Sequence, residues 1–79
     1  MYLKTKEIAE QYSISRSTVY RIIEEMQALG RYPRDAIIGA RKMRRIDEDA
    51  LRDYMINIEQ LRHPTMRRYV KPYRKEKRR

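Results

Sequence analysis

Hydrogen-bond donors are concentrated in the short segment from Ser15 to Arg21. Within it lie three hydroxyl side chains, one phenol and two guanidinium groups. Hydroxyl groups donate to phosphate oxygens, and a guanidinium group can pair bidentately with the O6 and N7 acceptors of guanine. These residue types at this spacing therefore predict a nucleic-acid contact surface. Its candidate residues are Ser15, Arg16, Ser17, Thr18, Tyr20 and Arg21.

A second group of candidate residues surrounds a turn further along the chain. Arg41, Lys42, Arg44 and Arg45 follow Gly39, and short β-prone segments flank them. A basic hairpin that follows a donor-rich helix is typical of a wing, which lies along the phosphate backbone or in the minor groove. The alternative interpretation is a solvated turn.

The charge of the chain is unevenly distributed. Lys and Arg number 20 against 11 Asp and Glu, which gives a net charge of +9. Residues 67–79 hold eight of these cations and one acid, and so carry +7, which leaves +2 for residues 1–66. A nearly neutral body with a basic arm favours a polyanion partner over a merely solubilising tail. We assign residues 1–63 to one folded domain and residues 64–79 to a basic C-terminal arm that is partly disordered.

Two helices joined by a very short connection must position the donor-rich segment. The first is expected over residues 6–12, with Thr5 as its cap. The second is expected over residues 16–29, because apolar residues recur there at helical spacing. Ser15 is a good N-cap for this helix, and Gly30 is placed to end it in a left-handed conformation.

The remainder of the domain is expected to contain a hairpin and a third helix. Residues 36–38 and 43–46 would form its two strands around a tip at residues 39–42. Asp47 would then cap a helix that continues to about Leu61. The predicted fold is mainly α: a winged helix-turn-helix with a two-stranded β-hairpin wing and a C-terminal helix.

At these positions the sequence resembles the small MerR-like winged-helix domains of the excisionase family. The resemblance extends roughly from Tyr2 to Leu61. In its first half the matching residues are Thr5, Glu7, Ala9, Ser15, Ser17, Thr18, Val19, Tyr20 and Arg21. In its second half they are Arg44, Arg45, Asp47, Leu51 and Tyr54.

The resemblance implies double-stranded DNA binding in a mobile element or phage. The helix that begins at Arg16 would enter the major groove, and residues 39–45 would act as the wing. Such domains serve as excisionases, which bend DNA to direct an integrase, and also as small transcriptional regulators and repressors. An integrase or recombinase, or further copies of the protein on DNA, would be the protein partner.

Two other classes of function remain as alternatives. Seven tyrosines without Phe or Trp are compatible with base stacking in an RNA or single-strand-binding module. The basic arm is compatible with a protein-interaction adaptor. Larger MerR-type activators continue into a coiled coil with an effector site, whereas this chain continues into the arm, so we expect no small-molecule ligand.

The sequence offers little support for catalysis or metal binding. Cysteine is absent, and the single histidine, His63, directly precedes a proline. Every serine lies in a capping or turn context, unlike a catalytic nucleophile. We therefore expect no enzyme activity, no catalytic residue, no metal and no cofactor. No apolar segment approaches the ~20 residues of a membrane span, so we expect no membrane partner and a cytoplasmic, bacterial nucleoid-associated location.

Overall fold

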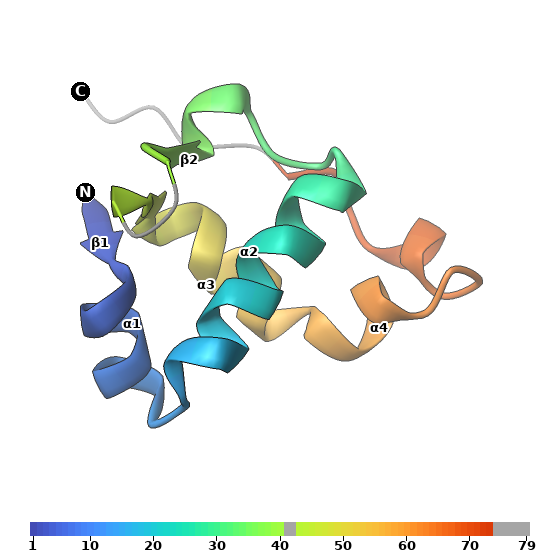
Figure 1. The fold of residues 1–79 in the computed structure, drawn as a ribbon. Helices are drawn as coiled ribbons and strands as arrows, with labels where there is room; N and C mark the ends of the chain where they lie inside the picture. Colours follow the sequence, from blue (N-terminus) through green and yellow to red (C-terminus); the bar gives the residue numbers. More distant parts are fainter. Residues whose placement is uncertain (41–42, 74–79) are drawn as a thin grey trace.

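The computed structural model describes residues 1–40 and 43–73. Its first two helices are α1 (Thr5–Tyr12) and α2 (Arg16–Leu29), which pack against each other. α2 runs through the middle of the molecule, with α1 and the sheet on one side and α4 on the other (Figure 1). α1 begins one residue earlier than predicted. Lys4, rather than Thr5, is its N-cap residue, and the Lys4 backbone N–H donates to Glu7 Oε1 at 2.8 Å.

The connection between α1 and α2 is tight because its backbone polar groups are satisfied locally. Ser13 adopts a left-handed conformation with φ of 55°, and the Ile14 N–H donates to the Ala9 carbonyl oxygen at 3.0 Å. Ser15 caps α2 as predicted, since its Oγ accepts from the Thr18 N–H at 3.2 Å. Gly30 ends the helix with φ of 63°, where a residue without Cβ avoids strain.

The sheet has one strand more than the sequence suggested. β1 (Tyr2–Lys4), β2 (Ile37–Ile38) and β3 (Arg45–Asp47) form an antiparallel sheet in the order β1-β3-β2. Ile46 of the central strand lies opposite Leu3 on one side and Ile37 on the other. A short 3-10 helix, Arg34–Ala36, leads into β2. The predicted hairpin is present, and the N-terminal strand fixes it to the start of α1.

The tip of the hairpin requires a glycine. Gly39 has a φ of 82°, and a Cβ at this position would lie 2.4 Å from the Met43 carbonyl oxygen. On the returning side Met43 is exposed and Arg44 is half-buried. Arg41 and Lys42, two of the predicted contact residues, lie outside the described residues.

The predicted third helix is in fact two helices. α3 (Glu48–Ile56) and α4 (Ile58–Arg62) are separated at Asn57. The Asn57 backbone leaves the helical conformation, with φ of −105° and ψ of 16°. Its N–H and its side-chain Nδ2 both donate to the Asp53 carbonyl oxygen, at 3.2 and 2.9 Å. Asp47 caps α3 as predicted, because its Oδ2 accepts from the Ala50 N–H at 3.3 Å.

A single hydrophobic core joins the helices to the sheet. The predicted apolar face of α2 is buried from Val19 to Met26, whereas Leu29 at its end is half-buried. The buried apolar residues are Leu3, Ile8, Val19, Ile22, Ile23, Met26, Ala36, Ile46, Ala50, Leu51, Tyr54 and Leu61. Within the described ranges, helices predominate and the small antiparallel sheet forms the wing, which confirms the winged helix-turn-helix fold. None of the described helices is long and apolar enough to cross a membrane.

The first part of the C-terminal arm lies against this core. It contains a short 3-10 helix, Arg67–Tyr69, and the Arg67 Nε donates to the Leu61 carbonyl oxygen at 3.1 Å. The partly buried side chains of Val70 and Tyr73 pack against the core. Residues 74–79 lie outside the described residues.

The buried phenol of Tyr54 should make the free energy of unfolding depend on pH in the alkaline range. Burial, followed by the hydrogen bond to Glu25, raises the pKa of Tyr54 from 10.0 to about 12. The unfolded chain therefore releases this proton first, so the free energy of unfolding should be unaffected below pH 10 and fall between pH 10 and 12. Urea unfolding at several pH values would measure this.

Tyr54→Phe should lower the free energy of unfolding by about 1 kcal/mol at neutral pH, because the substitution removes the hydrogen bond to Glu25. The free energy of unfolding of this variant should fall less steeply at alkaline pH than that of the wild type, and the half-buried phenol of Tyr32 would account for the remaining fall. Tyr69→Phe, at an exposed tyrosine, is the control and should keep the wild-type profile. Identical alkaline slopes for wild type and Tyr54→Phe would contradict the assignment to Tyr54.

Candidate nucleic-acid interface

The start of α2 presents the predicted donors in two groups. Arg16, Ser17 and Arg21 are exposed, whereas Thr18 and Tyr20 are half-buried at the edge of the core. An N-terminal helical turn with exposed donors offers backbone and side-chain hydrogen bonds to an anion in front of it. The exposed group is therefore available to an external ligand.

Two of the predicted donors have a structural role of their own. Besides accepting from the Thr18 backbone, Ser15 Oγ lies 3.0 Å from Thr18 Oγ1, and either hydroxyl can be the donor. One of the two hydroxyl hydrogens is thus used within the cap. The pair holds the first turn of α2 in place and retains one hydroxyl hydrogen for a ligand.

Residues from four parts of the chain meet around a hollow of about 290 Å³ beside the start of α2. We call this hollow the basic cleft. β1, α1, α2 and the returning side of the wing all contribute to it. Its described lining residues are Lys4, Thr5, Lys6, Arg16, Tyr20, Met43, Arg44 and Arg45.

The basic cleft joins the two predicted contact regions. Arg16 and Tyr20 come from the donor-rich helix, and Arg44 and Arg45 come from the wing, some 25 residues further along the chain. The structure also places Arg21 on the exposed surface of α2, outside the cleft lining. The cleft is thus a continuous surface between the helix and the wing.

Two contributors to the cleft were missed by sequence reasoning. Lys4 ends β1, and Lys6 lies in the first turn of α1. They reach the wing only because β1 pairs with β3, with Lys4 opposite Arg45. The one available signal was the position of two lysines on either side of the residue that begins α1.

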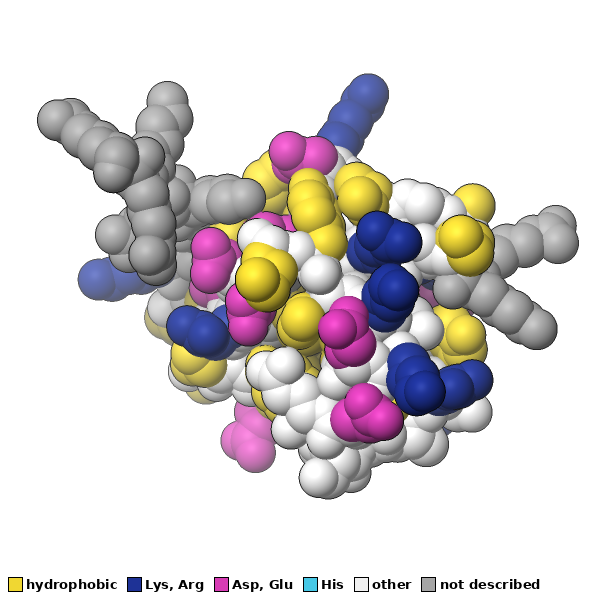
Figure 2. Space-filling view, turned by 90° about the vertical axis from the view of Figure 1, so that its left-hand side faces the viewer, with side chains coloured by type: hydrophobic (Ala, Val, Ile, Leu, Met, Phe, Trp, Pro, Cys, Tyr) yellow, Lys and Arg dark blue, Asp and Glu magenta, His cyan; other side chains and the backbone are white. Residues whose placement is uncertain are grey.

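The charge of the cleft favours an anionic ligand. Five of its eight described lining residues are Lys or Arg, and none is acidic. Cations that converge on one hollow repel one another, and a bound anion relieves this repulsion. Figure 2 shows Lys and Arg side chains gathered on the face that carries β1 and α1, with acidic side chains beside them. The arrangement suits successive phosphates of a nucleic-acid backbone.

Among residues 1–40 and 43–73, no group of three or more His, Cys, Asp and Glu side chains could hold a metal ion. His63 is exposed at the end of α4. Of the predicted contact residues, Arg16, Tyr20, Arg44 and Arg45 line the basic cleft.

A comparison with known families identifies the first half of the fold. A family model described as "HTH domain" matches residues 2–43, which are 42 of the 79 residues. The chain belongs to this helix-turn-helix family. No curated protein and no solved structure was found to match the chain.

The family match contains six of the eight described residues that line the cleft, and Arg44 and Arg45 lie just beyond it. It covers β1, both helices of the helix-turn-helix and the chain as far as Met43. In a helix-turn-helix domain the second helix enters the major groove with its N-terminal residues at the base edges, and here that helix is α2. DNA binding is thereby supported as the general function of this helix-turn-helix domain.

Proposed function

We propose that the protein is an excisionase-type architectural factor of a mobile element or phage. It would bind double-stranded DNA and shape it for a site-specific recombinase. The observation that carries the proposal is the basic cleft, which unites the start of α2 with the wing. In this role the protein acts by binding alone, without a catalytic step, a cofactor or a small-molecule ligand.

The geometry would allow the protein to contact the major groove and the phosphate backbone of DNA at the same time. With α2 in the major groove, exposed Arg21 and Ser17 would face the bases, and Arg16 lines the cleft beside them. The adjoining phosphate strand then passes the wing residues Arg44 and Arg45. Base contacts supply sequence specificity, and phosphate contacts fix the register.

Bending follows from the one-sided distribution of these cations. Neutralising phosphates on only one face of a duplex reduces their repulsion on that face, so the DNA curves toward the protein. Bending a short site smoothly costs on the order of 1–6 kcal/mol, which additional phosphate contacts offset. The resemblance to the excisionase family supports this use of the surface, and a recombinase or further copies of the protein would be the partner.

The test uses a duplex site selected from random sequences with the full-length protein. Arg21→Ala should weaken binding to the selected site by roughly 5- to 150-fold, the range for a lost bidentate base contact. Binding to random duplex should change little, because a base contact carries sequence information. Arg52→Ala, which removes an exposed arginine of α3, is the control and should leave both affinities unchanged. Equal losses on both duplexes would make Arg21 a backbone contact.

The architectural role is tested by bending and recombination on the same site. The protein should bend the selected duplex and, where an integrase is encoded beside it, should stimulate excision by that integrase. Binding without bending, combined with repression of a neighbouring promoter, would favour the transcriptional regulator instead. Tighter binding to single strands or RNA than to duplex would overturn the proposal.

A further inference from the structure

Met43 is an apolar side chain exposed on a cationic surface. It is 71% exposed, and it lines the basic cleft together with five Lys and Arg side chains. Among the described residues of the lining, it is the one with neither a charge nor a hydroxyl group. A single exposed apolar side chain is ordinary on a protein surface, but one that lies among five cations adjoins whatever anion they bind. Met43 is therefore placed to contact the ligand of the cleft.

The backbone that carries Met43 is held by its neighbours in the chain. The Met43 N–H donates to the Ala40 carbonyl oxygen at 2.9 Å. The Met43 carbonyl oxygen lies so close to Gly39 that a Cβ on that glycine would be only 2.4 Å away. Two residues after Met43, the chain enters β3 at Arg45, which lies opposite Lys4 of β1. The position of Met43 is therefore set by backbone contacts on both sides of it.

A second side chain with carbon surface lines the cleft from α2. Tyr20 is half-buried and packs against the core, and it contributes to the same hollow as Met43. Arg16, one turn earlier on this helix, is exposed and lines the hollow as well. The lining thus combines cations with two side chains that offer carbon surface, one from the helix and one from the wing.

This combination matches the chemistry of a DNA backbone. Along each strand, negatively charged phosphates alternate with deoxyribose rings, whose carbon atoms form an uncharged surface. Cations such as Arg16 and Arg45 neutralise phosphates, whereas Met43 has no donor to offer them. Because a strand turns its phosphates and sugars outward, the uncharged surface within reach of Met43 is that of a sugar.

We infer that Met43 is a specificity-determining residue, which packs against a deoxyribose of the bound strand and makes the basic cleft selective for DNA over RNA. The inference rests on the proposed binding of duplex DNA. The 2′ position of the sugar borders the minor groove, which is the side that a wing beside the recognition helix approaches. A ribose would bring its 2′-hydroxyl against the methionine, where the hydroxyl loses water without gaining a hydrogen bond. Burial of this kind weakens binding by roughly five- to 150-fold.

The experiment replaces each nucleotide of the selected duplex in turn by its ribonucleotide and measures binding of the full-length protein. On the strand that passes the cleft, one position should weaken wild-type binding by at least about five-fold. Met43→Ala should remove most of this ribose penalty. It should also weaken binding to the all-DNA site by roughly four- to fifteen-fold, because each methylene-sized group that the sugar covers contributes about four-fold.

The matched control is the same substitution at a methionine outside the cleft lining. Met66 is 43% exposed, and Met66→Ala should keep both the wild-type affinity and the ribose penalty. Met43→Gln has nearly the same length as the wild type, and its amide can hydrogen bond to a 2′-hydroxyl. This variant should therefore bind the deoxy and ribo forms of the site equally. Since Met43 is exposed, its variants should melt as the wild type does.

A modified sugar separates the hydroxyl group from the shape of the ring. A 2′-fluoro nucleotide favours the ring pucker of ribose but has no hydroxyl group to desolvate. At the sensitive position it should bind the wild-type protein as deoxyribose does.

Three results would overturn the inference. The first is a wild-type protein that binds the duplex without any ribose-sensitive position. The second is a ribose penalty that persists unchanged in Met43→Ala. The third is an equal penalty for the 2′-fluoro nucleotide, which would assign the effect to ring pucker. Failure of the wild-type protein to bind duplex DNA at all would instead refute the proposed function.

Discussion

Replacing Arg16 and Arg45 together by Gln should weaken binding to duplex DNA by roughly 60-fold at 0.1 M salt. Both side chains are exposed and line the basic cleft, one from α2 and the other from β3. Each phosphate contact contributes about 0.9 to the slope of log K against log salt concentration, which corresponds to about eight-fold at 0.1 M relative to 1 M. The loss of two contacts therefore weakens binding by the roughly 60-fold stated above, and lowers the slope of log K against log salt concentration by nearly 2.

The control for this variant must change the net charge equally. Arg34 and Arg52 are also exposed and lie outside the cleft lining. Changing both to Gln should reduce affinity only slightly, because neither side chain lines the cleft and exposed charges that touch no phosphate are screened by salt. Fluorescence anisotropy over a range of salt concentrations measures both variants. Equal losses for the two pairs would show that affinity depends on net charge alone, and that the cleft is not the interface.

The helix-turn-helix was predictable because its signals are local. The apolar spacing from Val19 to Met26 defines the buried face of α2, and Ser15 and Gly30 mark its two ends. Each signal acts within a few residues, and the physical reasons, capping and helical periodicity, do not depend on distant parts of the chain. The structure therefore agrees with the sequence most closely in this region.

The cleft was only half predictable, because its assembly depends on a distant pairing. β1 has three residues, too few for alternation to distinguish a strand from a loop. Its partner β3 begins at Arg45, and nothing near Lys4 in the sequence indicates that pairing. Once the strands pair, Lys4 and Lys6 are brought to the wing cations. A surface built by non-local contacts requires the fold to be known.

The break after α3 and the fixed linker that follows α2 were missed for a related reason. The apolar spacing runs through Asn57, so periodicity favours one continuous helix, whereas the backbone leaves the helical conformation at Asn57. Likewise Arg31 and Asp53 are charged residues in separate predicted elements, and only packing brings them within 3.0 Å. Tyr73 was expected to belong to the arm alone, although its ring packs against Tyr32.

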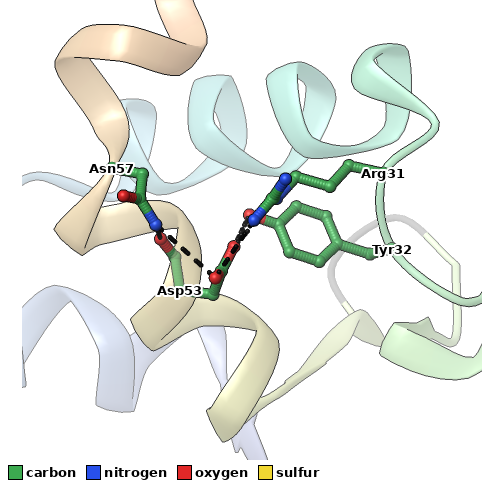
Figure 3. Close-up of polar contacts among 4 residues, drawn as sticks. All are labelled: Arg31, Tyr32, Asp53 and Asn57. Atoms are coloured by element: carbon green, nitrogen blue, oxygen red, sulfur yellow. Dashed lines mark hydrogen bonds and ion pairs between the residues drawn. The ribbon is translucent and has the colours of Figure 1, made fainter. Parts of the chain in front are cut away.

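Asp53→Ala should lower the free energy of unfolding by about 2–4 kcal/mol, the largest effect on stability expected outside the apolar core. Its carboxylate accepts hydrogen bonds from Arg31 and Tyr32 (Figure 3). Arg31 and Asp53 are only 12% and 22% exposed, so neither partner regains full hydration when the other is removed. For a domain of this size, such a loss lowers the melting temperature by roughly 10–20 °C.

Thermal unfolding followed by circular dichroism tests the role of Asp53 through three further variants. Asp53→Asn keeps an oxygen acceptor for Tyr32 but loses the ion pair, and should therefore lie between Asp53→Ala and the wild type. Arg31→Met in the Asp53→Ala background should cost little more, because the uncompensated cation is then gone. Glu24→Ala, at an exposed position of α2, is the control and should stay within about 0.5 kcal/mol of the wild type. A melting temperature for Asp53→Ala equal to that of Glu24→Ala would show that the carboxylate does not hold the linker, and the support of Tyr32 beneath Tyr73 would have to come from packing alone.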